Sequence, residues 1–79
     1  MRVGERPVGW FHPGDLVLVR FDCILFHSPD SLSGTQLARD QRGVVINANF
    51  VDHMIEVMIA GRRGWCEPAH LDIILRGGP

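Results

Sequence analysis

The sequence predicts a small all-β domain, an antiparallel barrel of five short strands, and three observations lead to this expectation. Apolar residues gather in short runs, and some of these runs alternate with polar residues, the period of strands with one buried face. Glycine, proline, asparagine and aspartate, which favour turns, separate the runs. No segment repeats its apolar residues with the helical period over the length of an ordinary helix.

The chain of 79 residues is expected to have an arm, one barrel and a tail. Residues 1–13 carry glycines and prolines without periodicity, and we assign them to an N-terminal arm. The barrel is assigned to residues 14–75 and a flexible tail to residues 76–79. A chain of this length has room for one hydrophobic core only.

The first half of the barrel is expected to hold two strands joined by a long loop. Pro13-Gly14-Asp15 is a turn signal before the first strand, at residues 16–21, which residues 24–26 extend or restart. Residues 27–41 are polar and rich in serine and aspartate, as is typical of a loop. Residues 42–46 open the second strand.

The second half of the barrel reads as a hairpin, one helical turn and a closing strand. Residues 55–60 alternate well and predict the third strand. Gly61-Arg62-Arg63-Gly64 is expected to be a tight turn, and residues 65–67 begin the fourth strand. Residues 68–71 suit one helical turn, and residues 72–75 form the fifth strand.

Strand alternation also predicts which side chains fill the core, because neighbouring residues of a strand point to opposite faces. The predicted core consists of Val17, Val19, Val45, Ile55, Val57, Ile59 and Leu71.

The composition limits the classes of function. A net charge of −1 means that the chain lacks the excess of positive charge that attracts nucleic acid. This disfavours an RNA- or ribosome-associated barrel. A hydrophobic content of 46% is high for so small an interior and indicates apolar surface that a partner covers. Two cysteines give no disulfide framework and suit free thiols in a reducing compartment. Without a signal peptide or a bilayer-spanning run, the protein is expected to be cytoplasmic, or else the mature form of an imported protein.

Two Cys-x-x-x-His pairs, Cys23 with His27 and Cys66 with His70, supply the residue types of a zinc site. Structural zinc sites favour two cysteines separated by two to four residues, which neither pair provides. Cys23 also lies in an apolar run, where a free cysteine usually acts as a small hydrophobe. The expectation is therefore that the chain binds no metal or other cofactor, and that replacing both cysteines leaves partner binding nearly intact.

Catalysis by the isolated chain is not expected. Cys66, Glu67 and His70 supply a thiol and a base, but the charge of Glu67 would raise the pKa of the thiol. The sequence has no nucleophile elbow, phosphate loop or dinucleotide fingerprint. A barrel of this size is filled by its own side chains, which leaves no interior for a substrate.

Arginines supply a candidate basic docking patch. Arg39 and Arg42 flank the end of the long loop, and Arg62 and Arg63 lie at the predicted hairpin turn. The alternative is a solvated hairpin tip whose arginines have counter-charges nearby.

Several segments together match the pattern of a known family. Gly14–Val19 fits a Gly-Asp-x-Val-x-Val opening, and Ile24–Asp30 fits an apolar strand that ends in an aromatic, a histidine and a proline followed by an acid. Gly43–Val45 fits a Gly-x-Val strand start, and His70–Ile74 is similar to the C-terminal ending, with His70 in place of an acid. Over residues 14–75 the chain thus resembles the variable subunit of ferredoxin–thioredoxin reductase, an SH3-like barrel.

The resemblance implies an electron-transport accessory subunit with no redox group or active site of its own. Such a subunit would cover and stabilise, in a heterodimer, a catalytic subunit that holds an iron–sulfur cluster and a redox-active disulfide. That partner passes electrons from ferredoxin to thioredoxin. The alternative is a free-standing SH3-like module that binds protein, for example a phage-encoded structural or host-inhibitory protein.

Strand alternation also predicts a partner surface. With Val17 and Val19 inside, the leucines beside them point outward, where a solvated barrel gives them no role. The alternative is that the N-terminal arm, through Trp10 and Phe11, covers these leucines within the monomer. The predicted interface consists of Leu16, Leu18, Met58 and, at its rim, Trp65.

Overall fold

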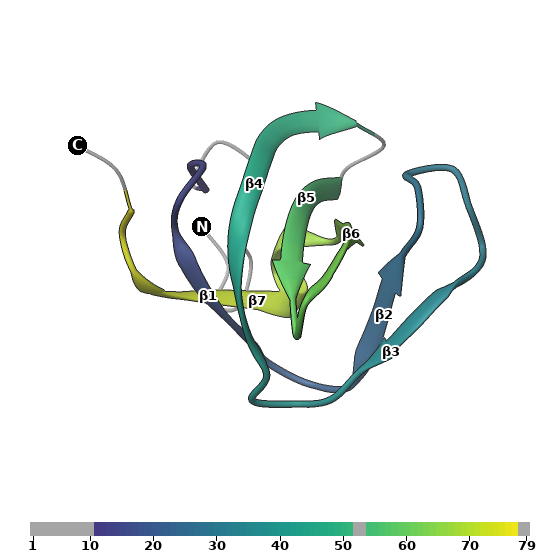
Figure 1. Ribbon diagram of the computed structural model, residues 1–79, viewed down its shortest axis with the longest axis horizontal. Helices are drawn as coiled ribbons and strands as arrows, with labels where there is room; N and C mark the ends of the chain where they lie inside the picture. The colour runs from purple at the N-terminus through teal and green to yellow at the C-terminus, as the bar shows by residue number, and fades with distance from the viewer. Residues whose placement is uncertain (1–10, 52–53, 78–79) are drawn as a thin grey trace.

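The computed structural model describes residues 11–51 and 54–77, and the side chains of these residues except 49–51. It is all-β, as expected, with seven strands in one antiparallel sheet ordered β3-β2-β6-β5-β4-β1-β7 (Figure 1). The strands are β1 (Leu16–Val19), β2 (Cys23–Phe26), β3 (Gly34–Leu37), β4 (Arg42–Val51), β5 (Met54–Ile59), β6 (Arg62–Cys66) and β7 (Leu71–Leu75). A 3-10 turn, η2 (Pro68–His70), precedes β7 and confirms the predicted helical turn.

The expected closed barrel of five strands is wrong, because the sheet is open and has two further strands. β2 and β3 form a hairpin within residues 23–37, which lies at one side of the curved sheet (Figure 1). β2 is a separate strand and not a continuation of β1, and β3 lies inside the expected loop of residues 27–41. Gly34–Leu37 contains a single apolar residue, so it carries no periodic signal from which a strand could be predicted.

The other five strands form an antiparallel meander with a returning strand. β4, β5 and β6 follow one another in space, and β7 pairs with β1, which lies between β7 and β4. The long β4 bends over the molecule (Figure 1), and its register with β5 shifts after Val45 and again after Asn47. Such irregularities increase the local bend and twist, so the two arms of β4 can curve around the core.

The composition of the core confirms the prediction made from strand alternation. All seven predicted core residues are buried, with at most 1% of each exposed. Leu25 of β2 and Leu37 of β3 join them, so one face of the additional hairpin completes the same core. Phe11 and Cys66 are also part of it.

The hairpin turn between β5 and β6 spans residues 59–62, two residues earlier than the expected turn at residues 61–64. Ala60 and Gly61 form the turn, with φ angles of 53° and 76°. Two successive left-handed residues define the type I′ turn that suits the twist of paired strands. Gly64, which was expected to end the turn, lies buried in β6, where a Cβ atom would come within 2.6 Å of the Phe26 carbonyl oxygen.

Asp15 ties the turn before β1 to the residues after β7. Its side chain is fully buried, and its carboxylate accepts hydrogen bonds from the backbone N–H groups of His12 (2.9 Å) and Gly77 (3.0 Å). Arg76 adds an ion pair at 3.1 Å. Arg76 and Gly77 belong to the segment expected to be a flexible tail, and in the structure Asp15 holds both.

Candidate functional site

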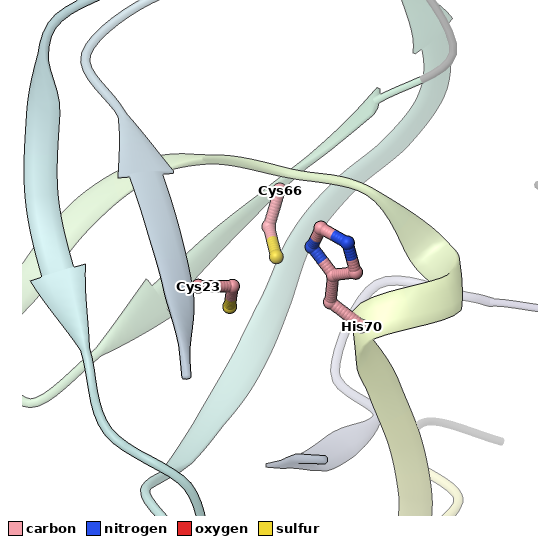
Figure 2. A group of neighbouring side chains, drawn as sticks. All are labelled: Cys23, Cys66 and His70. Carbon is pink, nitrogen blue, oxygen red and sulfur yellow. The ribbon is translucent and has the colours of Figure 1, made fainter. Parts of the chain in front are cut away.

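The structure brings together Cys23, Cys66 and His70, three of the four residues in the two Cys-x-x-x-His pairs (Figure 2). Their two sulfur atoms and one histidine nitrogen all lie within 4.8 Å of one another. Cys23 begins β2, Cys66 ends β6, and His70 ends η2. His27 is not part of this group, because it lies beyond the other end of β2, where its Nδ1 is 3.4 Å from the Ser33 hydroxyl.

Two local features place these side chains. β2 runs antiparallel beside β6, so the start of β2 lies near the end of β6. After Cys66, Glu67 is extended, and a proline at the first position of η2 begins the 3-10 turn. This turn folds the chain back so that the His70 ring faces the Cys66 sulfur (Figure 2). A strand end followed by one 3-10 turn thus accounts for the Cys-x-x-x-His spacing of Cys66 and His70.

The His70 ring is held from several sides. Its Nε2 lies 3.4 Å from a carboxylate oxygen of Glu67, and the Phe21 ring packs edge-on against it at 5.0 Å between centroids. Its Nδ1 is buried and has no hydrogen-bond partner among the described residues. Figure 2 shows the nitrogen next to Cγ, which is Nδ1, on the side of the Cys66 sulfur. An unpaired buried nitrogen therefore points at the thiols.

The two cysteines form an unequal pair. Cys66 is fully buried and Cys23 is half-buried. The Cys66 thiol donates a hydrogen bond to the Glu67 carbonyl oxygen at 3.7 Å. The interaction between the two thiols lowers the pKa of Cys23 and raises that of Cys66, which burial raises further. The carboxylates of Asp22 and Glu67 oppose ionisation of Cys23, because a negative charge nearby disfavours a thiolate.

The arrangement of Cys66, Glu67 and His70 does not form an accessible nucleophile with its base. Cys66 has no exposed surface, whereas a reactive cysteine needs both access and a lowered pKa. The group can instead act as a set of metal ligands, because two sulfur atoms and one nitrogen atom lie close together.

The outer face of the sheet carries a second candidate site, a continuous apolar row across four strands. Met58 pairs with Val44, Val44 with Leu16 and Leu16 with Leu75, and paired residues share a face. Met58, Val44 and Leu75 are 45%, 41% and 66% exposed, and Leu16 is half-buried. We call Met58, Val44, Leu16 and Leu75 the outer apolar row.

The other predicted interface residues lie beside this row. Leu18 is half-buried on the same face of β1, between Arg42 of β4 and Asp72 of β7. Trp65 is half-buried on β6 and pairs with Glu56, the neighbour of Met58 on the same face of β5. The structure thus places all four predicted interface residues on one continuous face.

Sequence reasoning missed two members of the row. Val44 precedes the buried Val45, so strand alternation was a sufficient signal for its outward position. Leu75 had no such signal, because the register between β7 and β1 shifts between Ile73 and Leu75. A shift of one residue moves a side chain to the other face of a strand.

The alternative that the N-terminal arm covers the leucines of β1 concerns Trp10 and Phe11. Phe11 lies in the hydrophobic core with 1% of its surface exposed, packed with the inward residues of the sheet. Trp10 lies outside the described residues.

The predicted basic patch falls at one end of the sheet. Arg62 and Arg63 begin β6 directly after the β5–β6 turn, and Arg42 begins β4, whose first pairs lie beside the end of β5. Arg39 lies in the turn before β4. All four are exposed, and Arg63 pairs with Glu56 at 2.6 Å.

Comparison with known proteins finds no matching family model and no curated protein or solved structure with a significant match. Among the described residues, no helix has the length and apolar character needed to cross a bilayer.

Proposed function

We propose that this chain is a non-catalytic subunit that binds a protein partner through the outer apolar row. The observation that carries the proposal is the cross-strand alignment of Met58, Val44, Leu16 and Leu75. Three of these side chains have between 41% and 66% of their surface exposed. Large contiguous apolar patches are rare on the exposed surface of monomeric proteins and mark interaction sites.

The row is not needed to complete the fold. The inward faces of the same strands already fill the core, with Val17, Val45 and Val57 fully or almost fully buried. Burying an apolar side chain stabilises by about 25 cal/mol for each Å² removed from water. A partner that covers the row therefore gains free energy at no cost to the packing of this subunit.

The partner we propose is the iron–sulfur catalytic subunit of a ferredoxin-dependent thioredoxin reductase, or of a related redox complex in the cytoplasm. The resemblance over residues 14–75 supports this partner. Apart from the additional β2–β3 hairpin and the open sheet, the order of elements supports the SH3-like assignment on which this partner rests. That order is β1, a meander of β4, β5 and β6, a 3-10 turn, and β7 returning beside β1. A free-standing SH3-like module with another protein partner is the competing function.

Purification of the tagged chain from its source organism tests the proposal. We expect a stoichiometric partner that contains iron and cysteine. Met58→Asp and Leu75→Asp should abolish its capture, because each places a charge on exposed row surface without disturbing the core. Leu32→Asp is the matched control, since Leu32 is 97% exposed in the β2–β3 connection, away from the row.

The outcomes separate the candidates. A partner without iron, lost in the row variants only, would support the free-standing module. A partner retained by both row variants, or lost equally with Leu32→Asp, would contradict the proposed interface. Circular dichroism of each variant verifies that the sheet is intact.

A further inference from the structure

We infer that Cys23, Cys66 and His70 bind a single zinc ion through two thiolate sulfurs and Nδ1 of the imidazole, with Glu67 holding the ring in place. This site is separate from the proposed function, because its residues face inward from β2, β6 and η2 and not along the outer apolar row. It also reverses the expectation that the chain binds no metal, which rested on the spacing of residues along the sequence.

The distances suit zinc after small side-chain adjustments. With zinc–sulfur bonds of about 2.3 Å and zinc–nitrogen bonds of about 2.0 Å, tetrahedral ligand atoms lie roughly 3.5–3.8 Å apart. The three ligand atoms here already lie within 4.8 Å of one another. They come from two adjacent strands and a short turn, which keep the three backbone positions close together.

The unpaired Nδ1 atom of His70 is a second observation that favours a metal ion at this site. A buried polar atom without a partner is costly, and Nδ1 is the atom in this position. A carboxylate oxygen of Glu67 lies 3.4 Å from Nε2 of His70 and favours the tautomer that is protonated at Nε2. This tautomer leaves the lone pair of Nδ1 free. Histidine ligands of metals commonly donate their other N–H to a carboxylate in this way.

The charges around the site favour a cation. Two thiolates and one Zn²⁺ are neutral together, so metal binding removes the cost of a buried thiolate. Asp22 and Glu67 are the chain neighbours of Cys23 and Cys66, and their negative charges attract a divalent cation to the same place.

The donor set selects the kind of metal. Mg²⁺ and Ca²⁺ take oxygen ligands, whereas two sulfurs and one imidazole suit zinc. Three protein ligands leave one coordination position for water or an external donor. The Cys-x-x-x-His motif of β6 and η2 thus supplies two ligands, and Cys23 supplies the third from the neighbouring strand.

Metal titration of the reduced, full-length chain tests the site. We expect one equivalent of Zn²⁺ to bind, and Co²⁺ to give thiolate charge-transfer bands together with the visible bands of tetrahedral geometry. Cys23→Ser should reduce the charge-transfer intensity by about half, since one of two thiolates is lost, and His70→Gln should shift the visible bands. Glu67→Gln should weaken Zn²⁺ binding by roughly 10–100-fold, as removal of such outer partners typically does.

His27→Gln is the matched control, because it removes the other histidine of the repeated spacing and leaves the cluster intact. Its affinity and spectrum should equal those of the unaltered chain. Bound Zn²⁺ should also slow alkylation of both cysteines. Absence of stoichiometric binding, or binding that Cys23→Ser and His70→Gln leave unchanged while circular dichroism shows them folded, would overturn the site. A thiol alkylation rate unaffected by Zn²⁺ would do the same.

Discussion

Ala60 adopts a backbone conformation that alanine disfavours. Its φ of 53° places it in the left-handed region, next to Gly61 at 76°. For an ordinary L-residue this region costs about 1–2 kcal/mol, whereas asparagine visits it readily. The two-residue turn between β5 and β6 is therefore a place where the natural residue is not the most stable one.

We expect Ala60→Asn to raise the free energy of unfolding by about 0.5–1 kcal/mol, because Asn-Gly is a preferred pair for this turn. In a domain of this size the melting temperature should rise by a few degrees. Ala60→Val is the control and should lower it, since a β-branched residue tolerates positive φ poorly. A lower melting temperature for Ala60→Asn, measured by circular dichroism, would show that the turn is not of this type.

At the scale of elements, the β2–β3 hairpin depends on close contact with β6. Gly64 makes this contact possible, because a Cβ atom there would lie 2.6 Å from both a side-chain carbon of Leu25 and the Phe26 carbonyl oxygen. Leu25 and Leu37 are buried only when the hairpin lies on the sheet. One glycine in β6 thus decides whether this part of the core forms.

We predict that Gly64→Ala destabilises the protein by about 1–3 kcal/mol, the range of overpacked sites. The backbone oxygen of Phe26 cannot move aside as a flexible side chain would. The loss should appear as a lower denaturation midpoint and faster hydrogen exchange in β2 and β3. Gly61→Ala serves for comparison, since nothing lies within 4 Å of a Cβ atom there and only its φ opposes the change. Unaltered exchange in the hairpin of Gly64→Ala would contradict this contact.

At the scale of the whole molecule, Asp15 connects the two ends of the described chain. Burial acts to raise the pKa of its carboxyl, but hydrogen bonds from the backbone of Gly77 and His12 and the charge of Arg76 outweigh it and lower the pKa below its ordinary value of 3.8. A carboxyl with a lowered pKa in the folded state stabilises the protein above the ordinary value. That stabilisation is lost as the pH falls through the folded-state pKa.

We expect Asp15→Asn to lower the free energy of unfolding at neutral pH by about 1–3 kcal/mol, because the amide cannot accept all three hydrogen bonds. The difference from the unaltered chain should shrink as the pH falls below 3.8 and through the lower pKa of the folded state, where folded Asp15 also loses its charge. Urea unfolding at neutral and acid pH measures this. Asp30→Asn, on an exposed loop, is the control and should show little difference at either pH. A difference for Asp15→Asn that does not change with pH would refute the charge-based explanation.

Local sequence patterns were sufficient to predict the all-β class, the seven core residues and the helical turn before the last strand. Each follows from local information: alternation in residues 16–19 and 55–59, and a proline that begins a turn at Pro68. Pairing with β2 makes Gly34–Leu37 a strand, because the neighbouring strand and not the composition of the segment stabilises it. The candidate metal site also depends on long-range packing, since Cys23 and Cys66 are far apart in the sequence. Spacing along a chain reports only neighbours in sequence, whereas a site of this kind depends on which strands lie side by side.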